Sequence, residues 1–147
     1  MKASRKTDRK HAFCLIFQKD FDMAADIVDV LDYYLENFAE EGASEPDFIL
    51  GGIHGVYDNL ETIDRHIAET SSAWDISRIS KVDLAIMRLA VYEILYDDKI
   101  PEGTSINEAV ELAKAFSSED AGKFVNGVLG KIVRKLKEGK DTDANAD

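Results

Sequence analysis

The side chains best suited to chemistry in this sequence are cations, and they gather near its two ends. Residues 1–19 hold six Lys and Arg against one carboxylate, Asp8, and residues 123–140 hold six against Glu138. Each segment is therefore basic, although the whole chain carries a net charge of −11. Clustered cations bind phosphates, with an affinity that falls steeply as salt rises. The pattern is compatible with contact to RNA or DNA, but composition alone favours a solvated terminus.

Residues that could support catalysis or bind a metal are scattered. The three histidines, His11, His54 and His66, do not have metal-site spacing with the single cysteine, Cys14. Gly51-Gly52 lies in a helical pattern and lacks the preceding strand that a phosphate-binding loop requires. No Ser-centred nucleophile elbow is present. We therefore expect no enzymatic activity, no catalytic residues, no metal and no cofactor.

The elements that must position the cations are helices, because no segment has the alternation of a half-buried strand. Apolar residues at helical spacing predict helices at 12–17, 26–38, 46–71, 74–79, 82–95, 105–116 and 119–136. Segment 82–95 is apolar on nearly all sides, which indicates the most buried helix. Segment 46–71 reads as one long helix capped by Ser44, and Ser105 with Glu108 fits a capping box. The expected fold class is all-α, with about seven helices.

Three residues inside these helices carry further expectations. Gly127 and Gly130 lie in the last helix, where each Gly costs about 1 kcal/mol relative to Ala, so they predict a close helix-helix contact. Arg88 lies between apolar residues of the 82–95 segment. A buried Arg requires a paired carboxylate, so we interpret Arg88 as a structural residue.

Length and composition predict one domain. A chain of 147 residues buries about two-thirds of its unfolded surface and needs no disulfide, and the single Cys14 fits a reducing compartment. No leader-like segment and no apolar run of about 18 residues is found, so we expect a cytoplasmic protein without membrane contact. We expect the domain to span residues 1–138, with a basic arm at about 1–11 and a disordered acidic tail at 139–147.

Several motifs occur in a fixed order in the second half of the chain. An Arg-x-Ala-x-Tyr-Glu-x-Leu pattern at 88–95 precedes Ile100-Pro101, and the helical segments INEAVELAK and KFVNGVL follow from Ile106 and Lys123. On these motifs the sequence resembles the NusB family of bacterial transcription antitermination factors. The resemblance reaches from the basic N-terminus to about Leu136. It implies a compact helical bundle in two three-helix-like subdomains.

The resemblance also implies a function and a set of contact residues. Family members bind the single-stranded boxA element of nascent ribosomal RNA leaders together with NusE, a small-subunit ribosomal protein, and thereby act indirectly on RNA polymerase with other Nus factors. The RNA-binding positions that the resemblance implies here are Lys2, Arg5, Lys6, Arg9, Lys10, Phe17, Asp120, Lys123 and Phe124. Positions that would face RNA or the partner are Arg78, Lys81 and Asp83.

Two alternatives remain open at the level of sequence. Phe124 lies on an apolar stripe with Val128 and Leu129 and could belong to the core, and Asp120 could serve as an acid at a helix start. The alternative function is a helical protein-interaction module or homodimer without an RNA function, and homodimerisation of the unbound protein is compatible with either function.

Overall fold

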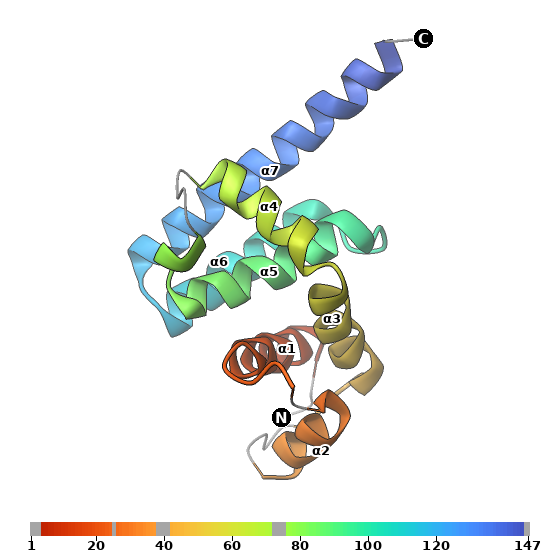
Figure 1. The fold of residues 1–147 in the computed structure, drawn as a ribbon, viewed down its shortest axis with the longest axis vertical. Helices are drawn as coiled ribbons and strands as arrows, with labels where there is room; N and C mark the ends of the chain where they lie inside the picture. The colour runs from red at the N-terminus through yellow and green to blue at the C-terminus, as the bar shows by residue number, and fades with distance from the viewer. Residues whose placement is uncertain (1–3, 25, 38–41, 72–75, 146–147) are drawn as a thin grey trace.

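The structure is a computed structural model whose regular elements, over the residues it describes, are all helical (Figure 1). It describes residues 4–24, 26–37, 42–71 and 76–145, the last six by their backbone only. Lys2, Phe38 and Trp74, which the sequence predicts in the basic arm and in two helices, lie outside the described residues. The elements are α1 (Arg5–Lys19), α2 (Ile27–Asn37), α3 (Pro46–Asp58), α4 (Leu60–Thr70), the 3-10 turn η1 (Ile76–Arg78), α5 (Lys81–Tyr96), α6 (Glu102–Phe116) and α7 (Glu119–Asn145).

The helices form two groups that meet at α5. Helix α1 packs against α3 and α5, and α2 packs against α3, whereas α4, α6 and α7 all contact α5. Figure 1 shows α1 to α3 in one half of the molecule and α4 to α7 in the other. The all-α bundle that the sequence predicts is therefore confirmed.

Helix α5 lies at the centre of the core, as its apolar sequence predicts. Every residue from Leu84 to Val91 is buried. Ile16 of α1, Ile53 of α3 and Ile67 of α4 are also fully buried in the same cluster. Because burying one such side chain contributes about 1.5–3 kcal/mol, this shared core fixes α1 firmly against the other helices.

The predicted long helix at 46–71 is two helices, α3 and α4, which meet at Asn59. Asn59 has non-helical backbone angles, φ −120° and ψ 22°, and its side-chain amide donates to the carbonyl of Gly55 at 2.8 Å. An Asn side chain that bonds to nearby backbone competes with helical hydrogen bonding, which accounts for the break. Ser44 is not the cap either, since the residue preceding α3 is Glu45.

Helix boundaries differ from the sequence-based expectation at three other places. Helix α1 begins at Arg5 with Ser4 as its cap, so most of the expected basic arm is helical. Helix α6 begins at Glu102, after Pro101, which leaves Ser105 buried inside the helix and not at its start. Helix α7 continues to Asn145, through most of the segment for which the sequence predicts disorder.

The glycines that make close contacts are not the ones that the sequence singles out. A Cβ atom at Gly127 would meet nothing within 4 Å among the described residues, and one at Gly130 would meet only Arg134 of the same helix. A Cβ atom at Gly55 would instead overlap the ring of Tyr92. Gly55 thus allows a tight contact between α3 and α5, and Gly122 allows another between α7 and α6, since a Cβ atom there would lie 2.9 Å from the Cγ of Lys114.

Candidate nucleic-acid interface

The first turns of α1 carry the exposed cations of the predicted site. Arg5 donates to a carboxylate oxygen of Glu45 at 3.1 Å and keeps 45% of its side chain exposed. Its guanidinium also lies 3.9 Å from the ring centre of Phe48. Lys6 is 68% exposed, with its Nζ 3.9 Å from a carboxylate oxygen of Glu108. Both cations are solvent-exposed and their ion pairs are therefore weak, so phosphates can compete for them.

Arg9 corrects the prediction that all five cations of the arm face RNA. Its side chain is 6% exposed and donates twice to Glu93, from Nε to Oε2 at 2.9 Å and from Nη2 to Oε1 at 3.0 Å. The hydroxyl of Ser105 donates to the same Oε1 at 2.9 Å. Arg9, Glu93 and Ser105 thus join α1, α5 and α6 in one buried network. A guanidinium held in this way is a structural group, because the pair of N–H groups that could bind a phosphate already binds Glu93.

Asp8, which interrupts the basic arm in the sequence, has a structural role as well. It is fully buried, and its two oxygens accept hydrogen bonds from the backbone amides of Ser44 and Glu45, each at 2.8 Å. The carboxylate therefore fastens the start of α3 to α1. Asp8 and Arg9 are thus committed to the fold, while the side chains of Arg5 and Lys6 remain solvent-exposed.

The start of α7 presents the second set of predicted contacts. Asp120 and Lys123 are exposed, whereas Phe124 is half-buried against the core, so part of its ring reaches the surface. Ser118 caps this helix by accepting from the amide of Ala121 at 3.0 Å. Asp120 is therefore an exposed acid of the first turn, a position favoured by the helix dipole.

An aromatic contact links this end of the molecule to α1. The ring of Phe116, the last residue of α6, lies 5.3 Å from that of the buried Phe13 of α1. Phe116 is 48% exposed, although the sequence assigns it to the apolar face of its helix. Its position as the final helical residue is the sequence signal that could have indicated exposure.

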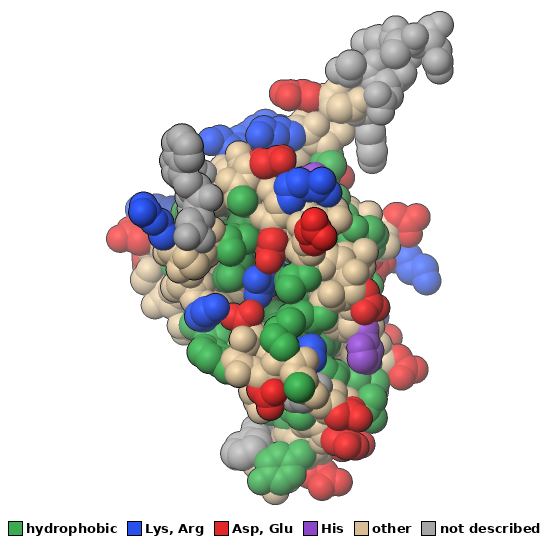
Figure 2. All heavy atoms as spheres, viewed as in Figure 1, with side chains coloured by type: hydrophobic (Ala, Val, Ile, Leu, Met, Phe, Trp, Pro, Cys, Tyr) green, Lys and Arg blue, Asp and Glu red, His purple; other side chains and the backbone are tan. Residues whose placement is uncertain are grey.

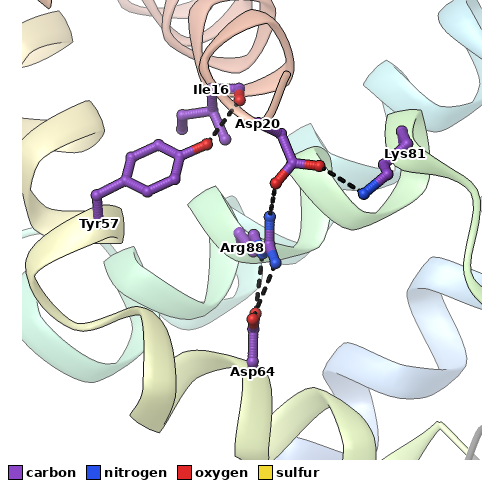
Figure 3. A network of polar contacts seen from close by, with 6 residues as sticks. All are labelled: Ile16, Asp20, Tyr57, Asp64, Lys81 and Arg88. Carbon is purple, nitrogen blue, oxygen red and sulfur yellow. Dashed lines mark hydrogen bonds and ion pairs between the residues drawn. The ribbon is translucent and has the colours of Figure 1, made fainter. Parts of the chain in front are cut away.

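A charged network lies at the other end of α1, as Figure 3 shows. Arg88 is buried and donates to both oxygens of Asp64, at 2.9 and 2.8 Å, and to Asp20 at 3.0 Å. Lys81 completes the network with an ion pair to Asp20 at 2.8 Å. Arg88 thus joins α5, α4 and the C-cap of α1, which confirms its interpretation as structural.

Burial and the charges of this network together shift the pKa values of Asp20 and Tyr57. Burial raises the pKa of Asp20, but hydrogen bonds from Lys81 and Arg88 outweigh it and hold that pKa below its ordinary value. Tyr57 donates its hydroxyl to the carbonyl of Ile16 at 2.8 Å. Burial raises the pKa of Tyr57 to about 12, with Arg88 opposing the shift and Asp20 adding to it.

The residues predicted to face RNA or a partner lie around this network. Arg78 is exposed on η1, and Lys81 is half exposed but paired with Asp20. Asp83 is buried at the start of α5, and its Oδ1 has no hydrogen-bond partner among the described residues. Nearby on α1, Phe17 is half-buried and lies edge-on to Phe21, which is 65% exposed and which the sequence does not single out.

Charge is distributed unevenly over the surface. On the face drawn in Figure 2, Lys and Arg side chains gather towards α7, and Asp and Glu side chains gather around the end that α2 forms. Among the residues that the structure describes, no group of three or more His, Cys, Asp or Glu converges as a metal site. None of the described helices combines the length and the apolar character that crossing a membrane requires.

Comparison with known proteins assigns the family. The NusB family model matches residues 6–134. The chain belongs to the NusB family. The transcription antitermination protein NusB of Acetivibrio thermocellus is 43% identical over 146 residues, which are 99% of this chain and 97% of that protein. NusB of Ruminiclostridium cellulolyticum is 42% identical over 130 residues, 87% of each chain.

Solved NusB structures share the fold. NusB of T. maritima is 35% identical, with a TM-score of 0.77, and the match covers 91% of this chain and 93% of that one. A crystal structure of the antitermination factors NusB and NusE in complex with double-stranded RNA contains a chain that is 26% identical, with a TM-score of 0.77 and coverage of 89% and 96%. Because the NusB relatives are transcription antitermination proteins, the expectation that the chain is not an enzyme is confirmed.

Proposed function

We propose that this protein is an antitermination factor that binds the boxA element of nascent ribosomal transcripts jointly with NusE, and that it links this RNA to elongating RNA polymerase and other Nus factors. One observation carries the proposal: a chain 43% identical to a NusB protein over nearly its whole length keeps exposed cations, Arg5 and Lys6, on the first turns of α1. On a protein of net charge −11, such a basic surface is where a polyanion encounters least repulsion.

The proposed RNA path runs from the start of α1 to the start of α7. Arg5, Lys6 and Lys10 would hold backbone phosphates, and Lys123 with the exposed edge of Phe124 would contact the strand further along. The Phe13–Phe116 ring contact supports this path, because it holds the end of α6 against α1. Asp120, in the first turn of α7, would then lie beside the strand and favour base amino groups over phosphates.

The proposed NusE surface lies at the opposite end of α1. The ion pair between Asp20 and Lys81 holds the end of α1 next to the start of α5. Exposed Phe21, with Phe17 beside it, supplies apolar area. Aromatic residues are enriched in protein interfaces, and the acids that flank Phe21, Asp20 and Asp22, would suit a basic partner.

Single-stranded boxA is the form of RNA that we propose for this chain. Its proposed site places aromatic rings beside cations, an arrangement that suits unstacked bases with their phosphates. The related NusB–NusE crystal structure holds double-stranded RNA, so both forms need to be compared directly.

Fluorescence anisotropy with labelled RNA tests the proposal. The RNAs are a boxA-like single strand, a scrambled single strand and a duplex, each measured with and without NusE at two salt concentrations. We expect the boxA strand to bind tightest, and NusE to tighten this binding further. Equal binding of all three RNAs, or no binding to any, would refute the proposal.

A double substitution locates the site within the same assay. Arg5→Ala with Lys6→Ala removes about two phosphate contacts, so the slope of log affinity against log salt falls by roughly two. Lys99→Ala is the matched control, because Lys99 is an exposed cation in the loop between α5 and α6. An unchanged slope in the double variant would remove α1 from the RNA site.

The second candidate function is a homodimer or protein-interaction module without an RNA role. Three large apolar side chains near α2 favour it by their exposure: Phe21 at 65%, Met23 at 53% and Tyr33 at 62%. Analytical ultracentrifugation across a concentration series measures self-association directly. Dimerisation combined with no affinity for any RNA, with or without NusE, would favour this alternative.

A further inference from the structure

A groove with a volume of about 290 Å³ lies between α1 and α6. Lys6 and Lys10 line it from α1, and Glu108, Glu111 and Phe116 line it from α6. This volume lies just below the range for small-molecule pockets, about 300–1,000 Å³. It offers room for one flat aromatic group and not for a helix.

An exposed aromatic ring forms part of the groove. Phe116 is 48% exposed, and the buried Phe13 supports its ring from α1. Leu112, one turn before it on α6, lines the groove as well. A supported ring open to solvent is the stacking surface on which proteins hold unpaired bases, whatever the sequence.

The two walls of the groove carry opposite charges. Lys6 on α1 pairs with Glu108 on α6 at 3.9 Å, across the groove. Glu111 lies one turn after Glu108, is exposed, and has no ion-pair partner among the described residues. A site for phosphate alone would not carry two carboxylates, because like charges repel. Carboxylates do accept hydrogen bonds from the amino groups of bases, as Glu and Asp do with cytosine.

We infer that this groove binds one unstacked nucleobase that bears an exocyclic amino group. The base stacks on Phe116, Glu111 accepts from its amino group, and Lys6 and Lys10 hold the adjoining phosphates. The inference rests on the proposed function, because it assigns a base-reading subsite to the same RNA. Cytosine, adenine and guanine carry such an amino group, whereas uracil does not.

Substitution of Phe116 tests the stacking. Phe116→Leu keeps an apolar side chain against Phe13 but removes the flat ring, so RNA affinity is expected to fall about 5- to 100-fold with an unchanged salt slope. Phe116→Tyr keeps the ring and is expected to bind within about twofold of the unsubstituted protein. Tyr33→Ala, which removes a 62% exposed ring on α2, is the control and should leave affinity unchanged.

Base substitution in the RNA tests the role of Glu111. Each amino-bearing base of the boxA strand is replaced by uracil in turn, and binding is measured with the unsubstituted protein and with Glu111→Gln. We expect uracil at one position of the RNA to weaken binding to the unsubstituted protein about tenfold. Binding to Glu111→Gln should be much less affected by uracil at this position. Glu61→Gln, at an exposed acid on α4, controls for the removal of one negative charge.

The outcomes separate this inference from the proposed function. If the protein binds boxA RNA through α1 but Phe116→Leu binds as tightly as the unsubstituted protein, the groove inference is overturned and the proposed function stands. The groove inference is also overturned if uracil replacement changes RNA affinity by the same factor at every position, in both the unsubstituted protein and Glu111→Gln. If the unsubstituted protein binds no RNA even with NusE, the proposed function fails and the groove inference fails with it.

Discussion

The substitution Arg9→Ala distinguishes a structural cation from an RNA-binding one. It leaves the carboxylate of Glu93 buried, with only the Ser105 hydroxyl still donating to it, in a side chain that is 2% exposed. Breaking a buried ion pair by removing one partner costs about 3–5 kcal/mol, because the remaining charge is neither solvated nor paired. That is a large share of the roughly 5–15 kcal/mol that stabilises a typical domain.

Matched variants isolate the charge from the loss of packing. Lys6→Ala removes a 68% exposed cation of the same helix and is expected to cost less than about 1 kcal/mol. The double variant Arg9→Met with Glu93→Leu removes both charges and keeps apolar volume. It is expected to recover most of the stability lost in Arg9→Ala, since apolar replacement of a buried pair is often neutral.

Urea unfolding followed by circular dichroism measures these differences. At about 2–4 °C per kcal/mol for a chain of this size, Arg9→Ala should also lower the melting temperature by roughly 6–20 °C. An Arg9→Ala variant that unfolds like the unsubstituted protein and instead lowers the salt slope of RNA binding by about one would contradict the buried ion pair. In that case the guanidinium would face phosphates, as the sequence predicts.

Three further predictions concern the packing and ionisation of the fold. Gly55→Ala should destabilise the protein by about 1–3 kcal/mol in urea unfolding, because its Cβ would overlap Tyr92, whereas Gly127→Ala should stabilise it by up to about 1 kcal/mol. Equal effects of the two substitutions would contradict the packing described here. The ionised carboxylate of Asp20 stabilises the fold above its ordinary pKa of about 4, and this contribution should disappear as pH falls through the lower pKa of the folded state. A stability difference between the unsubstituted protein and Asp20→Asn that does not shrink on acidification would contradict this. Ultraviolet titration should show a tyrosine ionising at about pH 12, and Tyr57→Phe should remove this step; a Tyr57→Phe variant that instead loses titration amplitude at about pH 10 would contradict the buried position.

The sequence predicts the helices well because their apolar periodicity depends on local spacing alone. The segment 82–95 shows the principle, since its apolar character on all sides corresponds to the buried helix α5. The break at Asn59 is not visible in that periodicity, because both α3 and α4 keep an apolar face in the same stretch of sequence. Only tertiary structure shows that α3 packs against α1 while α4 packs against α5 and α7.

The candidate site was predictable only in part, since charge patterns reveal where cations are but not which of them are paired. Arg5 and Arg9 look equivalent in the sequence, yet one is exposed and the other is buried against Glu93. Glu93 is the one carboxylate among the mainly apolar residues 84–95, and a lone buried acid of this kind is the signal that a cation must lie opposite it. By contrast, the exposure of Phe21 and Phe116 depends on how α1 and α6 end, which periodicity does not determine.

Transcription past a terminator in vitro tests the central claim most directly. The template carries boxA upstream of the terminator, a second template carries a scrambled element, and purified RNA polymerase, NusE and the other Nus factors are present throughout. Adding this protein is expected to raise read-through on the boxA template alone, and to do so only when NusE is present. Equal read-through with and without the protein on the boxA template would contradict the proposed function.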